Sequence, residues 1–442
     1  MVTRRLFFSI VTVLCFSTFL SCTQKEKKRL PNVILIMADD MGVETLNCYG
    51  NTQNSTPNID KMAAEGVLFN NCVSQPLCTP SRVKIMTGQY NYRNYEYFGY
   101  LSTNQHTFGN LFKEQGYATC IAGKWQLNGL AYKDSIADWN TMSRPIDFGF
   151  DQYCLWQLTK TAAEGERYAN PLIEQNGKTL PQNANLYGPD VFSDFIINFI
   201  EQNKNQPFFA YYPMVLVHDP FVPTPDSKDW NNVSKRYKND TLYFKDMVAY
   251  TDKIVGKIKA KIKALNLEDD TIIIFTADNG THPTIFSATK NGVVQGAKGN
   301  TITAGTHVPL IVNWGSKTQA PFKYDGLIEF SDFYATFAHL LENHTVKTDG
   351  KSFLNTIKNG KKENIRETAF VHYDPRWGKN VSQYRNRFVR TKHYKLYLDG
   401  KFYNLDTDKL EQHPLLDDSL SQEQLSVKKI LEQELSKHPK FK

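Results

Sequence analysis

The chain has 442 residues, of which 41% are hydrophobic, 22% charged and 13% aromatic, with 25 Gly and 19 Pro. This composition excludes a disordered, collagenous or coiled-coil protein and predicts a globular one, with two or three domains or one large core and a small appendage. The net charge of +7 is mild, and the densest basic run is the short segment 25–29, so we expect no nucleic-acid partner. An anionic small substrate stays open.

The first 22 residues have the pattern of an export signal. A basic stretch at 1–5 precedes an apolar run at 6–20, which is shorter than the roughly 20 residues of a membrane-spanning helix. The run ends in Ser21-Cys22, which resembles a bacterial lipobox with Cys22 as the lipidated residue; an incidental Cys in an ordinary secreted protein is the alternative. We expect a signal peptide at 1–22, a tether at 23–30 and an exported lipoprotein in the periplasm or on the surface of a Gram-negative bacterium. Its lipid would be its only contact with the membrane.

Five cysteines remain once Cys15 and Cys22 are set aside: Cys48, Cys72, Cys78, Cys120 and Cys154. An odd number in an exported protein predicts that at least one thiol has a role outside a disulfide framework. The sequence leaves the pairing of the others open, and their spacing does not indicate a zinc site.

Short apolar runs alternate with amphipathic segments along the chain, which predicts an α/β fold with a large, mainly parallel sheet sandwiched by helices. The clearest strands are expected at 33–37, 208–212, 271–276 and 309–312. The clearest helices are expected at 59–65, 107–115, 190–202 and 244–265. From about residue 345 the pattern changes to short alternating segments at 388–391, 394–398 and 401–405, with a hairpin signal at Asp399-Gly400. We expect a main domain at 31–345 and a small antiparallel α+β domain at 346–442, closed by a helix at 421–436.

Two of the predicted buried strands end in the same acidic pattern. The strand at 33–37 is followed by Ala38-Asp39-Asp40, and the strand at 271–276 by Ala277-Asp278-Asn279. Ligands of open α/β sheets bind beyond the carboxyl ends of the strands, and an all-oxygen set of this kind suits a hard divalent cation such as Ca²⁺ or Mg²⁺. Asp and Asn also cap turns after strands, so the pattern alone leaves a structural role open.

The most specific stretch is Cys78-Thr79-Pro80-Ser81-Arg82, followed after four residues by Thr87-Gly88. We expect a helix with Thr79 as its N-cap, Pro80 as its first residue and Gly88 at its end. Cys78 would then precede a helix N-terminus, where backbone N–H groups favour an anion, and Arg82 adds a fixed positive charge. Taken alone, a buried structural Cys would explain Cys78 as well.

This segment resembles the signature of the formylglycine-dependent, arylsulfatase-like sulfatases of the alkaline-phosphatase superfamily. It matches that signature at Cys78, Pro80, Ser81, Arg82, Thr87 and Gly88. Further blocks follow in family order at 33–40, 116–125, His218, 276–280 and 298–310. The resemblance implies an alkaline-phosphatase-like fold, with the catalytic site in the domain at 31–345.

The resemblance also implies a mechanism for hydrolysing sulfate esters. Cys78 would be converted by a formylglycine-generating maturation enzyme to Cα-formylglycine (3-oxoalanine), whose hydrated aldehyde is the nucleophile. One Ca²⁺, with Mg²⁺ the less favoured ion, would be held by Asp39, Asp40, Asp278, Asn279 and residue 78. Arg82, Lys124 and Lys298 would neutralise charge, and His218 would be the general acid.

Two positions depart from the family pattern. The family commonly has Gly-Lys-Trp-His, whereas this chain has Gly123-Lys124-Trp125-Gln126, and Gln126 can form hydrogen bonds but cannot act as a base. His218, His282 and His307 are the other candidates to accept the proton. The second departure is His307, which stands where an Arg commonly precedes Val-Pro-Leu.

The expected substrate is a sulfated carbohydrate from which an O-sulfate is removed, with the sugar and position left open. Trp125, His307, His372 and Arg376 are substrate-binding candidates. Tyr153, Trp156, Trp230 and Trp377 are further aromatic candidates for stacking on sugars, although for each aromatic a core position is favoured. Two other functions stay open. One is a glycan-binding lipoprotein impaired in catalysis, which Gln126 would explain. The other is a related metal-dependent phosphoesterase, which would have a second metal site and a Thr or Ser nucleophile.

Overall fold

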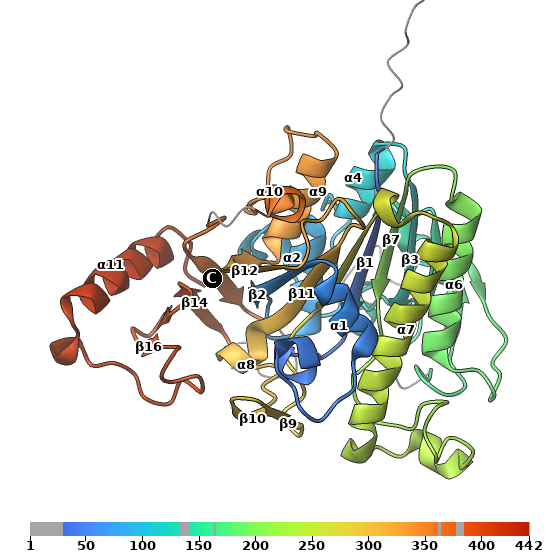
Figure 1. The fold of residues 1–442 in the computed structure, drawn as a ribbon, viewed down its shortest axis with the longest axis horizontal. Coiled ribbons are helices and arrows are strands. Elements are labelled where there is room, and N and C mark those ends of the chain that lie inside the picture. Colours follow the sequence, from blue (N-terminus) through green and yellow to red (C-terminus); the bar gives the residue numbers. More distant parts are fainter. Residues whose placement is uncertain (1–29, 133–140, 162–164, 361–363, 377–383, 442) are drawn as a thin grey trace, which may run out of the picture.

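A ten-stranded sheet runs through the protein, and helices cover both of its faces (Figure 1). The computed structural model describes residues 30–132, 141–161, 165–360, 364–376 and 384–441. The predicted signal peptide, the lipidation at Cys22, nearly all of the tether and Trp377 lie outside the described residues. No helix in the described ranges combines the length and the apolar character that a membrane crossing requires.

Parallel strands form the centre of the large sheet, as predicted. Strands β8, β1, β7, β3 and β4 lie side by side and run parallel, while β11 is antiparallel to both of its neighbours. In sheet order the strands are β12 (Phe322–Glu329), β2 (Val67–Val73), β11 (His307–Asn313), β8 (Thr271–Ala277), β1 (Asn32–Ala38), β7 (Phe208–Pro213), β3 (Ala118–Lys124), β4 (Gln152–Trp156), β5 (Ile173–Gln175) and β6 (Lys178–Thr179). Every residue of β1, β7 and β8 is buried, because helices cover both faces.

Two groups of helices make the outer layers. Helices α1 (Pro57–Ala64), α6 (Gly188–Asn203) and α7 (Phe244–Ala264) pack together on one face, and α2 (Cys78–Thr87), α4 (Phe108–Glu114) and α9 (Ser331–Leu340) on the other (Figure 1). All four helices predicted for the main domain are confirmed to within a few residues, and Thr107 caps α4 through a capping box. The shorter helices are α3 (Asn91–Asn94), α5 (Arg144–Asp147), α8 (Thr303–Thr306) and α10 (Leu354–Asn359), and the 3₁₀ turns are η1 (Val43–Thr45), η2 (Asn47–Tyr49), η3 (Leu130–Tyr132), η5 (Val233–Tyr237), η6 (Thr241–Tyr243), η7 (Glu268–Asp270) and η8 (Asp417–Ser419).

A small antiparallel sheet lies in the C-terminal part, as the alternating pattern predicts. Its strands are β13 (Ala369–Tyr373), β14 (Asn386–Arg390), β15 (Tyr394–Tyr397) and β16 (Phe402–Asn404). Gly400 has a φ of 86° in the turn between β15 and β16, a conformation that glycine adopts at little cost. Helix α11 (Gln422–Ser436), with Ser421 as its N-cap, packs on β14 and β15. A separate hairpin of β9 (Phe286–Thr289) and β10 (Gly292–Gln295) was not expected from the sequence.

One prediction from the sequence is wrong in detail, and one question that the sequence left open is answered. Helix α2 begins at Cys78 with Leu77 in the N-cap position, so Thr79 is inside the first turn and does not cap it; the helix does end at Gly88, whose φ is 66°.

The five cysteines of the described chain are all free, so no disulfide framework exists there. A buried core of this size makes such cross-links unnecessary for stability.

Candidate active site

The two acidic strand ends lie next to each other. Strands β1 and β8 are neighbours in parallel register, with Ala38 opposite Ala277, so the residues that follow leave the sheet side by side. The backbone N–H of Asp40 donates to Asp278 Oδ1 at 3.0 Å, and Asn279 Nδ2 donates to Asp40 Oδ1 at 2.9 Å. All four side chains, Asp39, Asp40, Asp278 and Asn279, are buried.

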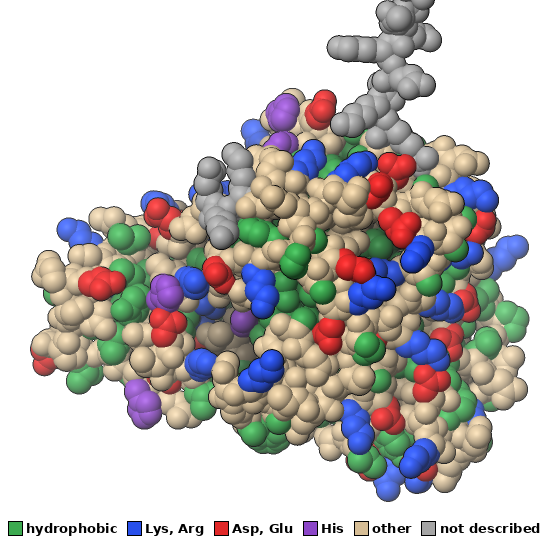
Figure 2. Space-filling view, viewed as in Figure 1, with side chains coloured by type: hydrophobic (Ala, Val, Ile, Leu, Met, Phe, Trp, Pro, Cys, Tyr) green, Lys and Arg blue, Asp and Glu red, His purple; other side chains and the backbone are tan. Residues whose placement is uncertain are grey.

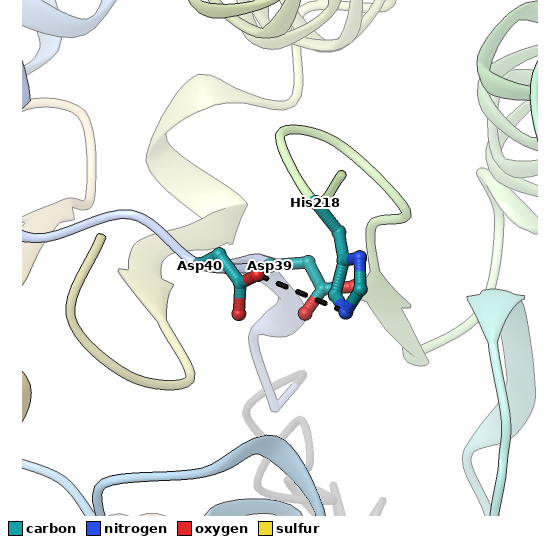
Figure 3. Close-up of side chains that lie close together, drawn as sticks. All are labelled: Asp39, Asp40 and His218. Carbon is teal, nitrogen blue, oxygen red and sulfur yellow. Dashed lines mark ion pairs between the residues drawn. The ribbon is translucent and has the colours of Figure 1, made fainter. Parts of the chain in front are cut away.

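This group has the chemistry of a site for a hard cation. Burial and the neighbouring Asp39 carboxylate hold the pKa of Asp278 well above its ordinary value, since three carboxylates share one enclosed space. Asn279 Oδ1 is buried and has no hydrogen-bond partner among the described residues, and a carboxamide oxygen is a good ligand for Ca²⁺ or Mg²⁺. In Figure 3, Asp39 and Asp40 extend from the end of β1 toward His218, and one ligand atom from each of the three lies within 4.8 Å of the others. The donor set therefore fits a divalent cation.

Two lysines, the buried Lys124 and the half-buried Lys298, contact the carboxylates. Lys124, the last residue of β3, places Nζ 2.9 and 2.7 Å from the two carboxylate oxygens of Asp39. Lys298 places Nζ 2.5 Å from Asp40 Oδ2 and 2.9 Å from His218 Nε2. Although burial opposes its charge, the Asp40 and Asp39 carboxylates raise the pKa of Lys298, so its ammonium stays charged beside them.

Cys78 lies at the N-terminus of α2, buried to 4% exposure. Burial opposes the thiolate, but Lys124 and Arg82 outweigh that effect and lower the pKa of Cys78. Arg82, one turn further along α2, donates from Nε to the carbonyl of Cys78 at 3.3 Å and from Nη1 to the carbonyl of Trp125, while its buried Nη2 has no partner in the described chain. Residue 78 therefore lies in an electropositive environment with one guanidinium N–H group available to a ligand.

His218 follows β7 and reaches the same place. Its Nδ1 lies 2.6 Å from the carbonyl of Asp219, and its Nε2 faces the Lys298 ammonium, an arrangement that matches the tautomer with its proton on Nδ1. Burial, followed by the nearby charges of Arg167 and Lys124, holds the pKa of His218 well below its ordinary value. The Lys298 and His218 side chains thus form a connected pair of proton carriers.

Gln126 has an unusual backbone and a specific partner. Its φ is 47°, in the left-handed region, and Nε2 donates to Gln157 Oε1 at 2.8 Å. Gln157 has a φ of 54° and follows β4, which runs parallel to β3 with Lys124 opposite Trp156. Left-handed backbone at non-glycine residues costs of order 1–3 kcal/mol each and persists where the surrounding structure fixes it.

A cavity of about 970 Å³ opens onto these residues. Cys78, Gln126, His218, His282 and Lys298 line it, and so do residues that sequence reasoning did not select, including Phe98, Arg167, Tyr373, Arg385 and Asn386. Leu77 also lines it, since it precedes the first residue of α2.

The four predicted substrate-binding residues do not belong to the described lining of this cavity. Trp125 is wrong as a subsite: it is fully buried, and its Nε1 donates to Asn128 Oδ1 at 2.7 Å. His372 is also wrong, because its ring packs against Tyr92 and Phe441; along β13 its neighbour Tyr373 points the other way, into the cavity.

His307 and Arg376 are likewise held elsewhere. His307 Nε2 lies 2.8 Å from the carbonyl of Asn70 on the neighbouring strand β2, and burial lowers the pKa of His307 to about 4. Arg376 pairs with Asp374 and donates to the carbonyl of Glu96. Among the other aromatics, Tyr153 and Trp156 are core residues as favoured, and Trp230 is half-buried against Tyr187.

Known proteins with similar sequences and folds act on sulfate esters. Residues 31–343 match the sulfatase family. The chain is 28% identical over 422 residues to the N-acetylgalactosamine-6-O-sulfatase of Bacteroides thetaiotaomicron, covering 76% of this chain and 79% of that protein. It is 30% identical to the arylsulfatase of Hemicentrotus pulcherrimus, covering 84% and 71%.

The fold has close counterparts among solved structures. One protein solved in complex with its substrate, D-glucosamine-2-N,6-O-disulfate, superposes with a TM-score of 0.73 over 92% of this chain and 97% of its own, at 22% identity. At that identity the likeness supports the fold only.

Proposed function

The chain belongs to the sulfatase family and is a sulfuric ester hydrolase, and from this premise we propose that it removes O-sulfate groups from sulfated glycans. One observation carries the proposal. The buried Cys78, in its electropositive environment, and the Lys298–His218 pair line a single cavity, and Lys298 contacts the Asp40 carboxylate at the end of β1. N-Acetylgalactosamine 6-sulfate is the first substrate to test, because the bacterial relative named above is a 6-O-sulfatase of that sugar.

Cys78 is the proposed nucleophile after oxidation to formylglycine by a maturation enzyme. In that form residue 78 would supply a hydrated aldehyde, whose two hydroxyl groups would provide the nucleophile for sulfur and the means of releasing the sulfate. Cys78 suits this role because it is the first residue of α2, so backbone N–H groups and the Lys124 and Arg82 charges face an anion bound there. Arg82 Nη2, buried without a partner, is available to donate to a sulfate oxygen.

Asp39, Asp40, Asp278 and Asn279 are the proposed ligands of one Ca²⁺, which would supply Lewis-acid polarisation of the sulfate. Lys124 and Lys298 balance the negative charge of Asp39 and Asp40, and they add positive charge where the sulfate oxygens would lie. His218 is the proposed general acid acting as a relay: the Lys298 ammonium, 2.9 Å away, passes a proton to Nε2, and Nε2 delivers it to the departing alcohol oxygen when its bond to sulfur breaks. Gln126 orients the site by hydrogen bonding, with its amide fixed by Gln157.

Sulfate release from a panel of sulfated mono- and disaccharides tests the proposal. The protein would first be checked by peptide mass for an aldehyde at residue 78, and Cys78→Ala would be the inactive blank. Cys48→Ala is the matched control, since Cys48 is a half-buried thiol outside the cavity. We expect release from at least one member by wild type and Cys48→Ala, and none by Cys78→Ala.

Two results would contradict the proposal. Undiminished release by Cys78→Ala would remove the nucleophile assignment. Tight binding of panel members without release, with aldehyde and Ca²⁺ in place, would favour the glycan-binding alternative that Gln126 keeps open.

We also propose that the protein is exported and attached by lipid at Cys22. The supporting observation is the basic and apolar segment that ends in Ser21-Cys22. Figure 2 shows basic and acidic side chains interspersed over the face drawn. Cell fractionation tests the anchor: wild type should partition with membranes, and Cys22→Ser should appear in the soluble fraction.

A further inference from the structure

Arg167 is a buried arginine of the cavity that neither the family signature nor the sequence patterns single out. It lines the cavity together with Cys78 and His218 and is 8% exposed. The next residue, Tyr168, holds this segment against the His218 loop, because its hydroxyl donates to the carbonyls of Val215 at 2.7 Å and His218 at 2.5 Å. Arg167 is thus fixed beside the proposed general acid.

The guanidinium of Arg167 has no counter-ion in the described part of the chain. Its Cζ lies 4.3 Å from the ring centroid of Trp156, so the flat group is stacked and oriented. Among the residues that the structure describes, no carboxylate lies within ion-pair distance of it, and its buried Nη1 has no hydrogen-bond partner. A buried, uncompensated charge is costly, so the fold retains this arginine for a partner that is not part of the chain.

The partner is not the sulfate that is cleaved, because that position already has its cations. Lys124, Arg82 and Lys298 are the positive charges that act most on Cys78, and Arg167 is not among them. Arg167 is instead the charge that acts most on His218, the proposed general acid, and it lines the same cavity. An anion bound there would belong to the sugar that leaves or to its neighbour.

We propose that Arg167 binds a second oxyanion of the substrate, a carboxylate or a further sulfate group near the ester that is cleaved. Guanidinium groups bind both kinds of oxyanion through paired hydrogen bonds, and a stacked guanidinium does so with little loss of conformational freedom. The inference rests on the proposed function and narrows it, since the preferred substrate becomes a glycan with at least two negative charges close together.

Kinetics on matched substrates test this inference. The reference is the monosulfated sugar with the highest release, N-acetylgalactosamine 6-sulfate being tried first. It is compared with the same sugar carrying a second sulfate, and with its uronate-linked disaccharide before and after reduction of the carboxyl group. The quantity measured is the ratio of kcat/KM for each doubly charged substrate to that for the reference.

We expect Arg167→Gln to lower this ratio at least tenfold, mainly through KM, and Arg167→Lys to retain part of it. The substrate whose ratio falls identifies the anion as sulfate or carboxylate. Arg236→Gln is the matched control, since Arg236 stacks on Trp230 at 4.2 Å outside the cavity and should leave the ratio as in wild type. An Arg167→Gln enzyme whose ratios all stay within twofold of wild type would overturn the inference.

A binding measurement separates failure of this inference from failure of the proposed function. Titration calorimetry of Cys78→Ala protein with the same sugars requires no turnover. If wild type releases no sulfate from any panel member, the proposed function fails. Tenfold tighter binding of the doubly charged sugar, lost in Cys78→Ala/Arg167→Gln, would still support the role of Arg167, and equal binding of both sugars would refute it.

Discussion

A buried network of four charges connects the helix that carries Cys78 to the C-terminal sheet. Lys84 on α2 donates to Glu329 Oε2 at 3.2 Å and to the carbonyl of Phe370 on β13 at 3.1 Å. Arg366 pairs with the second oxygen of Glu329 at 2.9 Å and with Asp332 on α9. Because all four charged side chains are almost fully buried, two positive and two negative charges balance each other within the protein.

Replacing Glu329 by Gln upsets this balance. Two buried cations then share the single carboxylate of Asp332, and breaking a buried ion pair by removing one partner costs about 3–5 kcal/mol. The double variant Lys84→Met/Glu329→Gln leaves the matched Arg366–Asp332 pair, so it should recover part of that loss. Lys253→Gln is the control, because the Lys253–Asp226 pair is more than half exposed on both sides and such pairs contribute about 0–1 kcal/mol.

Urea denaturation followed by circular dichroism measures these differences as shifts of the midpoint at constant slope. We expect the order of stability to be wild type and Lys253→Gln, then the double variant, then Glu329→Gln. A free energy of unfolding for Glu329→Gln within 1 kcal/mol of wild type would refute the reasoning. A double variant less stable than Glu329→Gln would show that uncompensated charge is not the cause.

Three further predictions concern the metal, a buried histidine and the Gln126–Gln157 pair. Adding Ca²⁺ to chelator-treated protein should raise the thermal unfolding midpoint. At a Ca²⁺ concentration of one hundred times the dissociation constant the gain in stability is about 2.7 kcal/mol, and it should be smaller in Asn279→Leu. Equal midpoints with and without Ca²⁺ would contradict the metal site. Burial, followed by the charge of Arg387, lowers the pKa of His372 to about 4 from an unfolded value near 6.5. The neutral imidazole therefore contributes fully to the free energy of unfolding above pH 6.5, and this contribution is lost as the pH falls toward 4. By pH 5 the loss is about 2 kcal/mol. Denaturation midpoints of wild type and His372→Phe between pH 7 and 4.5 check this, since the variant should lose less stability over that range. Gln157→Ala should lower turnover about fivefold, because it removes one hydrogen bond of about 1 kcal/mol to Gln126. Gln89→Ala is the control: it removes the half-buried Gln89–Gln105 hydrogen bond outside the cavity and should leave turnover as in wild type.

The central strands were predictable because they are buried on both faces. Strands β1, β7 and β8 are unbroken apolar runs, and such runs have few alternatives to a covered parallel strand. Strand β2 was not predicted, since Asn70 and Asn71 interrupt its apolar run at positions that are only half-buried. The short strands β5 and β6 carry polar residues; β5 depends on pairing with β4, and the edge strand β6 on pairing with β5, which no local pattern reveals.

The part of the site that lies on strand ends was predictable for a related reason. Asp39 and Asp278 follow adjacent parallel strands, so their proximity follows from the topology alone. The C-terminal contribution was predicted at the wrong residues, because the phase of β13 decides whether His372 or Tyr373 faces the cavity, and the sequence does not specify that phase. Arg167 and Arg385 come from irregular segments, where neither periodicity nor strand order indicates which side chains point inward.

Several residues near the cavity have buried polar atoms without partners or a strained backbone, and packing of the fold does not explain these features. Lys124 and Lys298 have carboxylate partners, so burial of their charge is compensated within the protein. Among the residues that the structure describes, Arg82 Nη2, Asn279 Oδ1 and Arg167 Nη1 are buried without partners, and Gln126 and Gln157 hold a left-handed backbone. Each of these features costs free energy in the isolated chain, so the proposed cation and the proposed polyanionic substrate would together offset what the chain leaves unpaired. In that case Arg82 and Asn279 would face the reacting group, and Arg167 would face the remainder of the glycan.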